Sequence, residues 1–147
     1  TLHGLASNLG LSTTLLGVDV IENGQVLARD VNEQQLYELV REHPSRLLVT
    51  AIGGQGHIIG RGNQQISPRV LRAIGLEHLR VLATKRKLAT LAGRPLLVDS
   101  GDGQLDSAFP DAIRVWTGYR EELLYPLGWS VERLVAADEG AEACANK

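Results

Sequence analysis

One glycine-rich stretch sets the expected architecture of this chain: Gly53-Gly54-Gln55-Gly56-His57-Ile58-Ile59-Gly60-Arg61-Gly62-Asn63-Gln64-Gln65-Ile66-Ser67-Pro68. An apolar run at residues 47–52 precedes it, and Ser67-Pro68 has the pattern of a helix start. A glycine-rich loop between a strand and a helix N-terminus can wrap its backbone around an anionic group. The stretch therefore predicts a strand, a ligand-binding loop and a helix.

Apolar runs of strand length alternate with helical patterns along the rest of the chain. Strands are expected at residues 14–21, 46–52, 78–84, 95–99 and 112–117, and residues 122–127 extend or pair with the last of them. Helices are expected at residues 2–9, 32–43, 67–75 and 85–92. Because the strands are apolar on both faces, the pattern predicts an α/β fold with a mostly parallel sheet of about five strands flanked by helices.

The composition is that of one globular domain. Of the 147 residues, 44% are hydrophobic and 22% are charged, an ordinary balance for a chain that buries a core. We expect residues 1–135 to form a single α/β domain and residues 136–147 to form a flexible tail. The chain contains no methionine and its first helix lacks a beginning, so we expect it to be the C-terminal part of a longer protein.

Charge and cysteine content exclude several classes of partner. A net charge of −2 and an aromatic content of 4% predict no nucleic-acid partner. No apolar run approaches the roughly 20 residues of a membrane span, so no membrane partner is expected. The single cysteine, Cys144, cannot form an internal disulfide, which predicts a cytoplasmic location.

The glycine-rich loop offers a set of ligand contacts. Glycines allow close backbone approach, Arg61 can pair with phosphate or carboxylate, and the amides of Asn63 and Gln64 can bind a ribose or a base edge. We assign to cofactor binding Gly53, Gly54, Gln55, Gly56, Gly60, Arg61, Gly62, Asn63 and Gln64. The alternative is a structural loop whose glycines serve tight turns. Its spacing matches neither the Walker A loop nor the dinucleotide fingerprint.

A second candidate is the acidic segment Asp99-Ser100-Gly101-Asp102-Gly103-Gln104-Leu105-Asp106. Asp99 ends a strand, a usual position for a carboxylate that binds a sugar or a metal ion. The three carboxylates can hold Mg²⁺ through water, although Asp and Gly are also typical of a solvated turn. We assign Asp99 and Asp102 as catalytic candidates and no residue as a resident metal ligand. Asp19 is expected either at a strand end that faces a cleft or buried with a partner.

Several stretches together resemble a known family. They are Leu15-Leu16-Gly17-Val18-Asp19-Val20, Asp30-Val31-Asn32-Glu33, the glycine-rich stretch, Ala83-Thr84-Lys85, Lys87-Leu88, Leu97-Val98-Asp99-Ser100-Gly101-Asp102 and Arg114-Val115-Trp116-Thr117-Gly118-Tyr119. In this order they resemble the C-terminal half of the predicted ATP-NAD kinase-like proteins, a group that includes the acetoin-catabolism protein X. The resemblance covers the chain up to about residue 127.

The resemblance implies a phosphotransferase. Related NAD kinases transfer the γ-phosphoryl group of ATP, or of polyphosphate, to the 2′-hydroxyl of the NAD adenosine ribose. Their Gly-Gly-Asp-Gly-Thr loop lies in an N-terminal domain, and this chain has no such loop. The chain is thus expected to supply part of a nucleotide- or phosphate-binding site and to be inactive as an isolated fragment. ATP or polyphosphate with Mg²⁺ is the implied cofactor, and NAD is the implied substrate.

In this scheme the loop at residues 53–65 supplies backbone amides and Arg61 clamps a charge. Asn63 orients a ribose or base, and Asp99 or Asp102 holds Mg²⁺ or accepts a hydroxyl group. The expected partners are a nucleotide or another phosphorylated small molecule, the N-terminal domain of the same protein, and further copies in a homo-oligomer. Two alternatives stay open: a β-rich fold like the C-terminal domain of known NAD kinases, and a non-catalytic module that binds a nucleotide or sugar phosphate for regulation.

Overall fold

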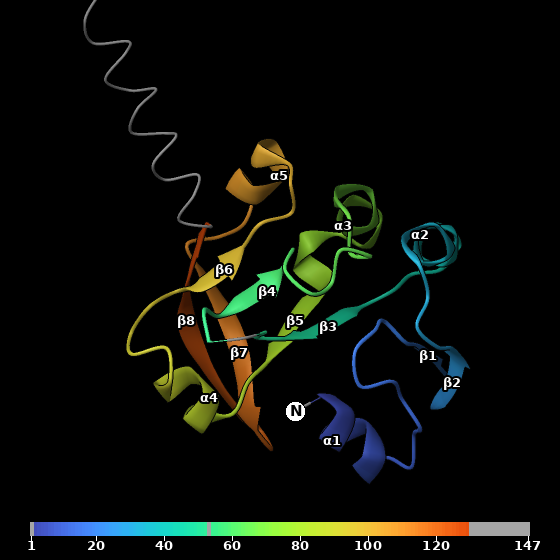
Figure 1. Cartoon of the computed structure of the whole chain (residues 1–147), viewed down its shortest axis with the longest axis horizontal. Coiled ribbons are helices and arrows are strands. Elements are labelled where there is room, and N and C mark those ends of the chain that lie inside the picture. Colours follow the sequence, from blue (N-terminus) through green and yellow to red (C-terminus); the bar gives the residue numbers. More distant parts are fainter. Residues whose placement is uncertain (1, 53, 130–147) are drawn as a thin grey trace, which may run out of the picture.

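The computed structural model describes residues 2–52 and 54–129, and Figure 1 shows how its elements are arranged. The expected tail at residues 136–147 lies outside the described residues. The helices are α1 (Leu2–Asn8), α2 (Glu33–Glu42), α3 (Pro68–Ile74), η1 (Leu76–His78), α4 (Lys85–Ala89) and α5 (Gly103–Ser107). The strands are β1 (Val20–Glu22), β2 (Gln25–Ala28), β3 (Leu47–Thr50), β4 (His57–Ile59), β5 (Leu79–Leu82), β6 (Leu96–Val98), β7 (Ala112–Gly118) and β8 (Glu121–Trp129).

The main sheet has six strands in the order β3-β5-β7-β8-β6-β4, and β1 and β2 form a separate hairpin. Four of its neighbouring pairs are parallel, and only β7 and β8 are antiparallel. The amide of Ile52 donates to the carbonyl oxygen of His57 at 2.7 Å. This bridge links the segment just after β3 to the first residue of β4, and β3 and β4 are the two outermost strands, so the sheet approaches a closed barrel (Figure 1).

The core consists of apolar side chains from this sheet and from the helices that pack on it. Ile58, Ile59, Leu96, Val81 and Val115 are almost completely buried. The helices α2 to α5 add apolar side chains from one face, as the helical spacing predicts. These are Leu36 and Val40 from α2, Val70, Leu71 and Ile74 from α3, Leu88 from α4 and Leu105 from α5. The fold is the expected α/β fold with a mostly parallel sheet, and its strand content also agrees with the β-rich alternative.

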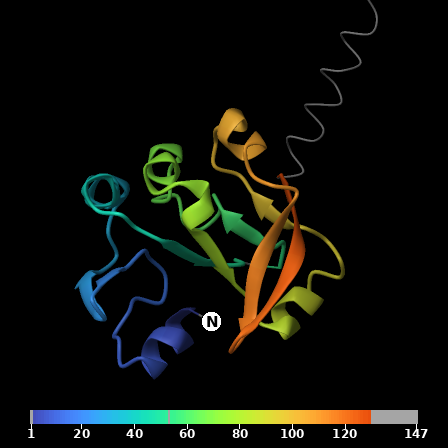
Figure 2. The same ribbon diagram turned by 180° about the vertical axis from the view of Figure 1, so that it is seen from behind.

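Seen from behind, the β7–β8 hairpin lies in front of the rest of the sheet (Figure 2). The side chains that it turns outward stay accessible: Trp116 is 43% exposed and Leu124 is 69% exposed. Arg114 of β7 and Glu122 of β8 form an ion pair on the same outer face. One face of the hairpin therefore packs on the core and the other meets solvent, as is usual for antiparallel strands.

Local sequence signals place several element boundaries correctly. Asn32 caps α2: its side chain accepts from the amide of Gln35 at 2.9 Å, and the Gln35 side chain accepts from the amide of Asn32 at 3.0 Å. Ser67 caps α3, Pro68 opens it, and Gly75 ends it with a φ of 87°. These helix ends are confirmed because each cap needs only residues within one turn.

Three expectations about elements are wrong. Residues 14–21 were expected as a buried strand, but only Val20–Glu22 pairs, and Leu15 and Leu16 are 78% and 87% exposed. The glycine-rich loop was expected to be continuous, but β4 divides it. The expected helices did not include α5, which begins at Gly103 with Asp102 as its N-cap. In each case the element is only three to five residues long. It depends on strand pairing or on a cap, and it is too short to give a periodic pattern of apolar residues in the sequence.

Candidate functional site

The carboxyl ends of β4 and β6 meet at one edge of the sheet. The two strands run parallel, with His57 opposite Leu97 and Ile59 opposite Val98. The amide of Asp99 continues the pairing by donating to the carbonyl oxygen of Ile59 at 3.2 Å. The turn that follows β4 and the acidic segment that follows β6 are therefore side by side, at the edge where ligands bind in open α/β sheets.

Gly60 lies against the backbone of Asp99. A Cβ built on Gly60 would be 2.1 Å from the carbonyl oxygen of Asp99, and the φ of Gly60 is +103°. Only glycine fits a position with that backbone angle and that close a neighbour. Gly62 also has a positive φ, +86°, and a Cβ there would meet the Ile52 side chain at 3.3 Å. Both glycines are required by the turn itself.

Asn63 holds this turn together. Its side chain is buried, Nδ2 donates to the carbonyl oxygen of Ile58 at 2.9 Å, and Oδ1 accepts from the amide of Gly60 at 2.9 Å. The Asn63 carbonyl oxygen accepts from the amide of Ile66 at 2.9 Å. The side chain that was expected to orient a ribose thus uses both of its polar atoms to close the turn.

The amino-terminal part of the glycine-rich stretch lies at the other end of β4. The carbonyl oxygen of Gly56 accepts from the amide of Leu97 at 3.0 Å, and that of Gly54 accepts from the Arg94 guanidinium at 3.2 Å. These residues therefore lie beside the segment that precedes β6, not the one that follows it. Gly54 and Gln55 are exposed, and Gly53 lies outside the described residues.

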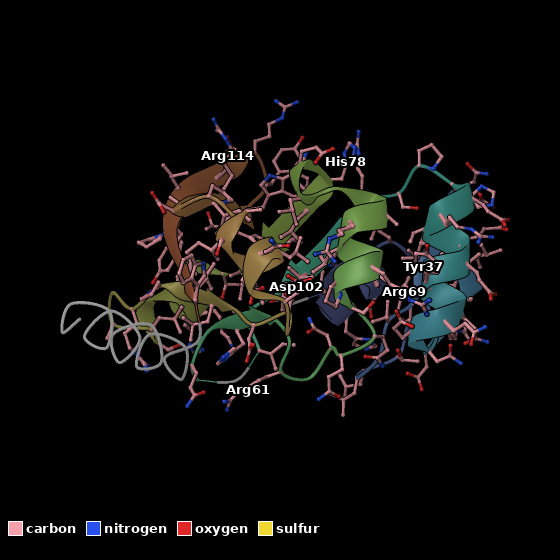
Figure 3. The ribbon with its side chains drawn as sticks, turned by 90° about the horizontal axis from the view of Figure 1, so that it is seen from above. Tyr37, Arg61, Arg69, His78, Asp102 and Arg114 are labelled. Carbon is pink, nitrogen blue, oxygen red and sulfur yellow. The ribbon has the colours of Figure 1, made fainter. Side chains whose placement is uncertain are left out.

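Two assigned side chains of the β4–α3 turn reach solvent, those of Arg61 and Gln64. Figure 3 shows Arg61 at the periphery of the molecule and well apart from Asp102. The turn thus presents a guanidinium and an amide on its outer side, while Asn63 faces inward. Arg61 and Asp102 do not converge on one point.

Asp102 is engaged in structural contacts. Its Oδ1 accepts from the amides of Gln104 and Leu105, each at 3.1 Å, and so caps α5. Its Oδ2 accepts from the Arg72 guanidinium of α3 at 2.6 Å. The Arg72 hydrogen bond is the main reason why the pKa of Asp102 lies below its usual value. The carboxylate therefore joins α5 to α3 (Figure 3).

Asp99 and Asp106 differ sharply in their surroundings. Asp106 is 2% exposed and accepts from the Ser100 amide at 3.1 Å and from the Ser100 hydroxyl at 2.5 Å. Asp99 is half-buried, and within residues 2–52 and 54–129 no group donates a hydrogen bond to its carboxylate. Asp99 is thus the carboxylate of the acidic segment that can still accept from a ligand.

The three carboxylates of this segment do not form a metal site. Asp102 and Asp106 direct their oxygens at their own backbone and at Arg72 and Ser100. Over the described part of the chain, no group of three or more His, Cys, Asp or Glu side chains is arranged to hold a metal ion.

Asp19 has the partners that the second expectation gave it, but it is half-buried and not buried. Its carboxylate accepts from the Thr14 amide at 2.6 Å, from the Thr14 hydroxyl at 2.9 Å and from the Asp30 amide at 2.9 Å. Burial alone would raise the pKa of Asp19, but the hydrogen bonds from Asp30 and Thr14 outweigh it and lower that pKa. Asp19 therefore ties residues 14–19 to the segment that precedes α2.

One polar network was not expected from the sequence. Glu33 at the start of α2 accepts from the Ser67 hydroxyl at 2.5 Å and from Arg69 Nε at 2.7 Å. The Arg69 guanidinium also lies 4.3 Å above the centre of the Tyr37 ring (Figure 3). The hydrogen bonds from Arg69 and Ser67 lower the pKa of Glu33 to about 2. Only the packing of α2 on α3 brings these residues together.

A hollow of about 640 Å³ opens beside this network, away from the glycine-rich turn. It is lined by Ala28, Val31, Gln34, Gln35, Tyr37, Glu38, Leu39, Arg41, Glu42 and Arg69. None of the residues assigned to catalysis or cofactor binding lines it. The hollow and the β4–β6 edge are therefore separate features, and the open carboxylate lies at the second.

Comparison with known proteins identifies the family. The model of the ATP-NAD kinase C-terminal domain matches residues 1–127, so the chain belongs to that family. Searches of curated proteins and of solved structures found no match. None of the helices in the described ranges is long and apolar enough to cross a bilayer.

Proposed function

We propose that this member of the ATP-NAD kinase C-terminal domain family supplies part of the nucleotide- or phosphate-binding site of a phosphotransferase. The observation that carries the proposal is the contact of Gly60 with Asp99 at the carboxyl ends of two adjacent parallel strands. The turn that contains Gly60 and the carboxylate of Asp99, which accepts no hydrogen bond from the described residues, both lie at that edge. This is the position at which α/β sheets bind nucleotides.

Each group at the edge has a role that suits its chemistry. The Asp99 carboxylate accepts a hydrogen bond from a ribose hydroxyl, since no group of the described chain occupies it. Gln64 and Arg61 on the outer side of the turn offer an amide and a guanidinium, and a guanidinium pairs with phosphate through two parallel hydrogen bonds. Asn63 and Gly60 keep the turn in shape, so they act on the ligand indirectly.

The edge supplies recognition rather than a complete catalytic apparatus. Phosphoryl transfer is accelerated mainly by positioning and by charges placed around the transferred group. The turn and the acidic segment provide one exposed cation, Arg61, and one open carboxylate, Asp99. We therefore propose that a second domain of the same protein brings the remaining phosphate-binding groups, with ATP or polyphosphate as donor and NAD as acceptor, and that the chain alone is inactive.

Calorimetric titration with NAD and with ATP tests this proposal. The full protein is expected to bind at least one of them, and Asp99→Asn should weaken that binding while the melting temperature stays within about 2 °C. Asp111→Asn is the matched control, because Asp111 is an exposed aspartate just before β7 and lies outside the acidic segment. Binding that is equally strong in both variants, or no heat with either ligand for the folded protein, contradicts the proposal.

A regulatory module is the second candidate. The Asp102 carboxylate already accepts hydrogen bonds from Arg72 and from the first turn of α5, which favours this candidate. Asp99 is then the one carboxylate of the acidic segment available to a ligand, whereas acid–base catalysis commonly uses two groups. In that case the edge binds a nucleotide or sugar phosphate without turnover. A coupled assay for phosphorylated NAD in the full protein separates the two candidates: product supports the kinase, and binding without product supports the module.

A further inference from the structure

The amino-terminal segment exposes an unusual share of the large apolar side chains. Of the eleven that are exposed in the described residues, six lie in the first 27 positions: Leu5, Leu9, Leu15, Leu16, Ile21 and Leu27. Leu15 and Leu16 are adjacent, and they are 78% and 87% exposed. Single exposed leucines are ordinary on protein surfaces, but a concentration of them marks an interaction site.

The loop that carries these two leucines has a fixed shape. Asp19 closes it by accepting from both the amide and the hydroxyl of Thr14, at 2.6 and 2.9 Å. A Cβ on Gly17 would be 2.4 Å from Oδ1 of Asp30, so the backbone packs tightly there. A loop that is ordered before binding loses less conformational entropy when it docks.

The segment is anchored at its base but carries its leucines away from the core. Val18 and Val20 are half-buried and pack against the core cluster, and the amide of Val31 donates to the carbonyl oxygen of Val18 at 2.9 Å. Ala6 is the buried residue of α1, and it does not belong to that cluster. The apolar run at residues 14–21 has the composition of a strand buried on both faces, which fits a surface that another domain covers.

We propose that the exposed leucines of residues 5–16, centred on the Leu15-Leu16 loop, form the docking surface for the amino-terminal domain of the same polypeptide. The family is that of a C-terminal domain, so the covering domain is joined to the chain on the side of α1, which itself carries Leu5 and Leu9. A tether of that kind gives an effective concentration of about millimolar, enough for a modest apolar patch to dock. The inference rests on the two-domain arrangement of the proposed function.

Hydrogen exchange measures the docking directly. The amides of residues 15–17 donate no backbone hydrogen bond in the described chain, so in the 147-residue chain they should exchange rapidly. In the protein that carries its amino-terminal domain, their exchange should be at least tenfold slower. Leu16→Glu in that protein should restore rapid exchange at residues 15–17. The matched control is Leu124→Glu, another exposed leucine at 69% on the outer face of β8, and it should leave the slow exchange unchanged.

Two results overturn the proposal. One is equally rapid exchange at residues 15–17 with and without the amino-terminal domain. The other is a dimer of the 147-residue chain, measured by light scattering, that Leu16→Glu converts to a monomer, because the occupant is then a second copy. Nucleotide titration of the same samples distinguishes failure of the docking surface from failure of the proposed function. Slow exchange without nucleotide binding supports the docking surface and contradicts the proposed function. Rapid exchange with nucleotide binding contradicts the docking surface and supports the proposed function.

Discussion

Gly60 and Asp99 pack so closely that a Cβ on the first would lie 2.1 Å from the carbonyl oxygen of the second. The two residues are far apart in sequence and follow two parallel strands, so their contact joins the glycine-rich turn to the acidic segment. The candidate site exists because of this contact. A substitution that separates the two backbones is expected to damage both the fold and ligand binding.

Gly60→Ala should therefore destabilise the protein strongly. The methyl group would clash with a backbone carbonyl that cannot swing aside, at a φ of +103° that side chains rarely adopt. We expect a loss of about 3 kcal/mol or more in the free energy of unfolding, measured by urea denaturation. Gly54→Ala is the control, since its Cβ would enter open space, and it should change stability by less than about 0.5 kcal/mol. Equal effects would show that the close approach does not matter.

Asn63→Ala should leave the Gly60 amide and the Ile58 carbonyl oxygen without their partner in a buried place. Unsatisfied buried polar groups cost about 1–3 kcal/mol each, so the loss of both partners should lower the free energy of unfolding by about 2–6 kcal/mol. Gln64→Ala, one residue further on and exposed, is expected to be nearly neutral for stability. If Asn63→Ala is also neutral, the turn does not depend on this side chain.

Arg61→Ala tests whether the exposed guanidinium of the turn binds the phosphate of a ligand. Loss of a charge-assisted hydrogen bond corresponds to about 1.5–3 kcal/mol, so the affinity for an anionic ligand should fall about 10- to 150-fold by calorimetry. The melting temperature should change little because the side chain is exposed. A large drop in melting temperature with unchanged affinity would instead assign Arg61 a structural role.

Two substitutions of Asp102 separate its two contacts. Asp102→Asn keeps a side chain that can cap α5 but removes the charge that pairs with Arg72, whereas Asp102→Ala removes both. We expect the urea midpoint to fall more for Asp102→Ala than for Asp102→Asn. Equal midpoints for the two variants would mean that the cap contributes nothing. A loss of turnover in Asp102→Asn without a change in its midpoint would favour the catalytic assignment.

The stability of the protein should depend on pH through Glu33. Its pKa is lowered from 4.5 to about 2 by the hydrogen bonds from Arg69 and Ser67. A carboxyl whose pKa is lower in the folded protein stabilises the fold above its unfolded pKa and loses that contribution as the pH falls through its folded pKa. The urea midpoint of the native protein should therefore exceed that of Glu33→Gln at pH 6, and the difference should shrink between pH 4.5 and pH 2. A difference that stays constant over this range would contradict the linkage.

The sequence alone determined the features that depend on neighbours in the chain. Asn32 with Gln35, Ser67 with Pro68, and Gly75 place helix ends through hydrogen bonds within one turn. Long apolar runs such as residues 46–52 and 78–84 locate the strands β3 and β5, because a run of consecutive apolar residues is typical of the strands of a parallel sheet. The alternation of these runs with helices was enough to predict the mostly parallel sheet.

Only the tertiary structure decided the site. The strand His57–Ile59 is too short to leave a pattern and exists through its pairing with β6, about forty positions later in the chain. That pairing divides the glycine-rich stretch, turns Asn63 inward, and places Gly60 on Asp99. Side-chain chemistry can be read from a sequence, but whether an amide faces a ligand or its own backbone depends on contacts between distant segments, and these form only when the chain folds.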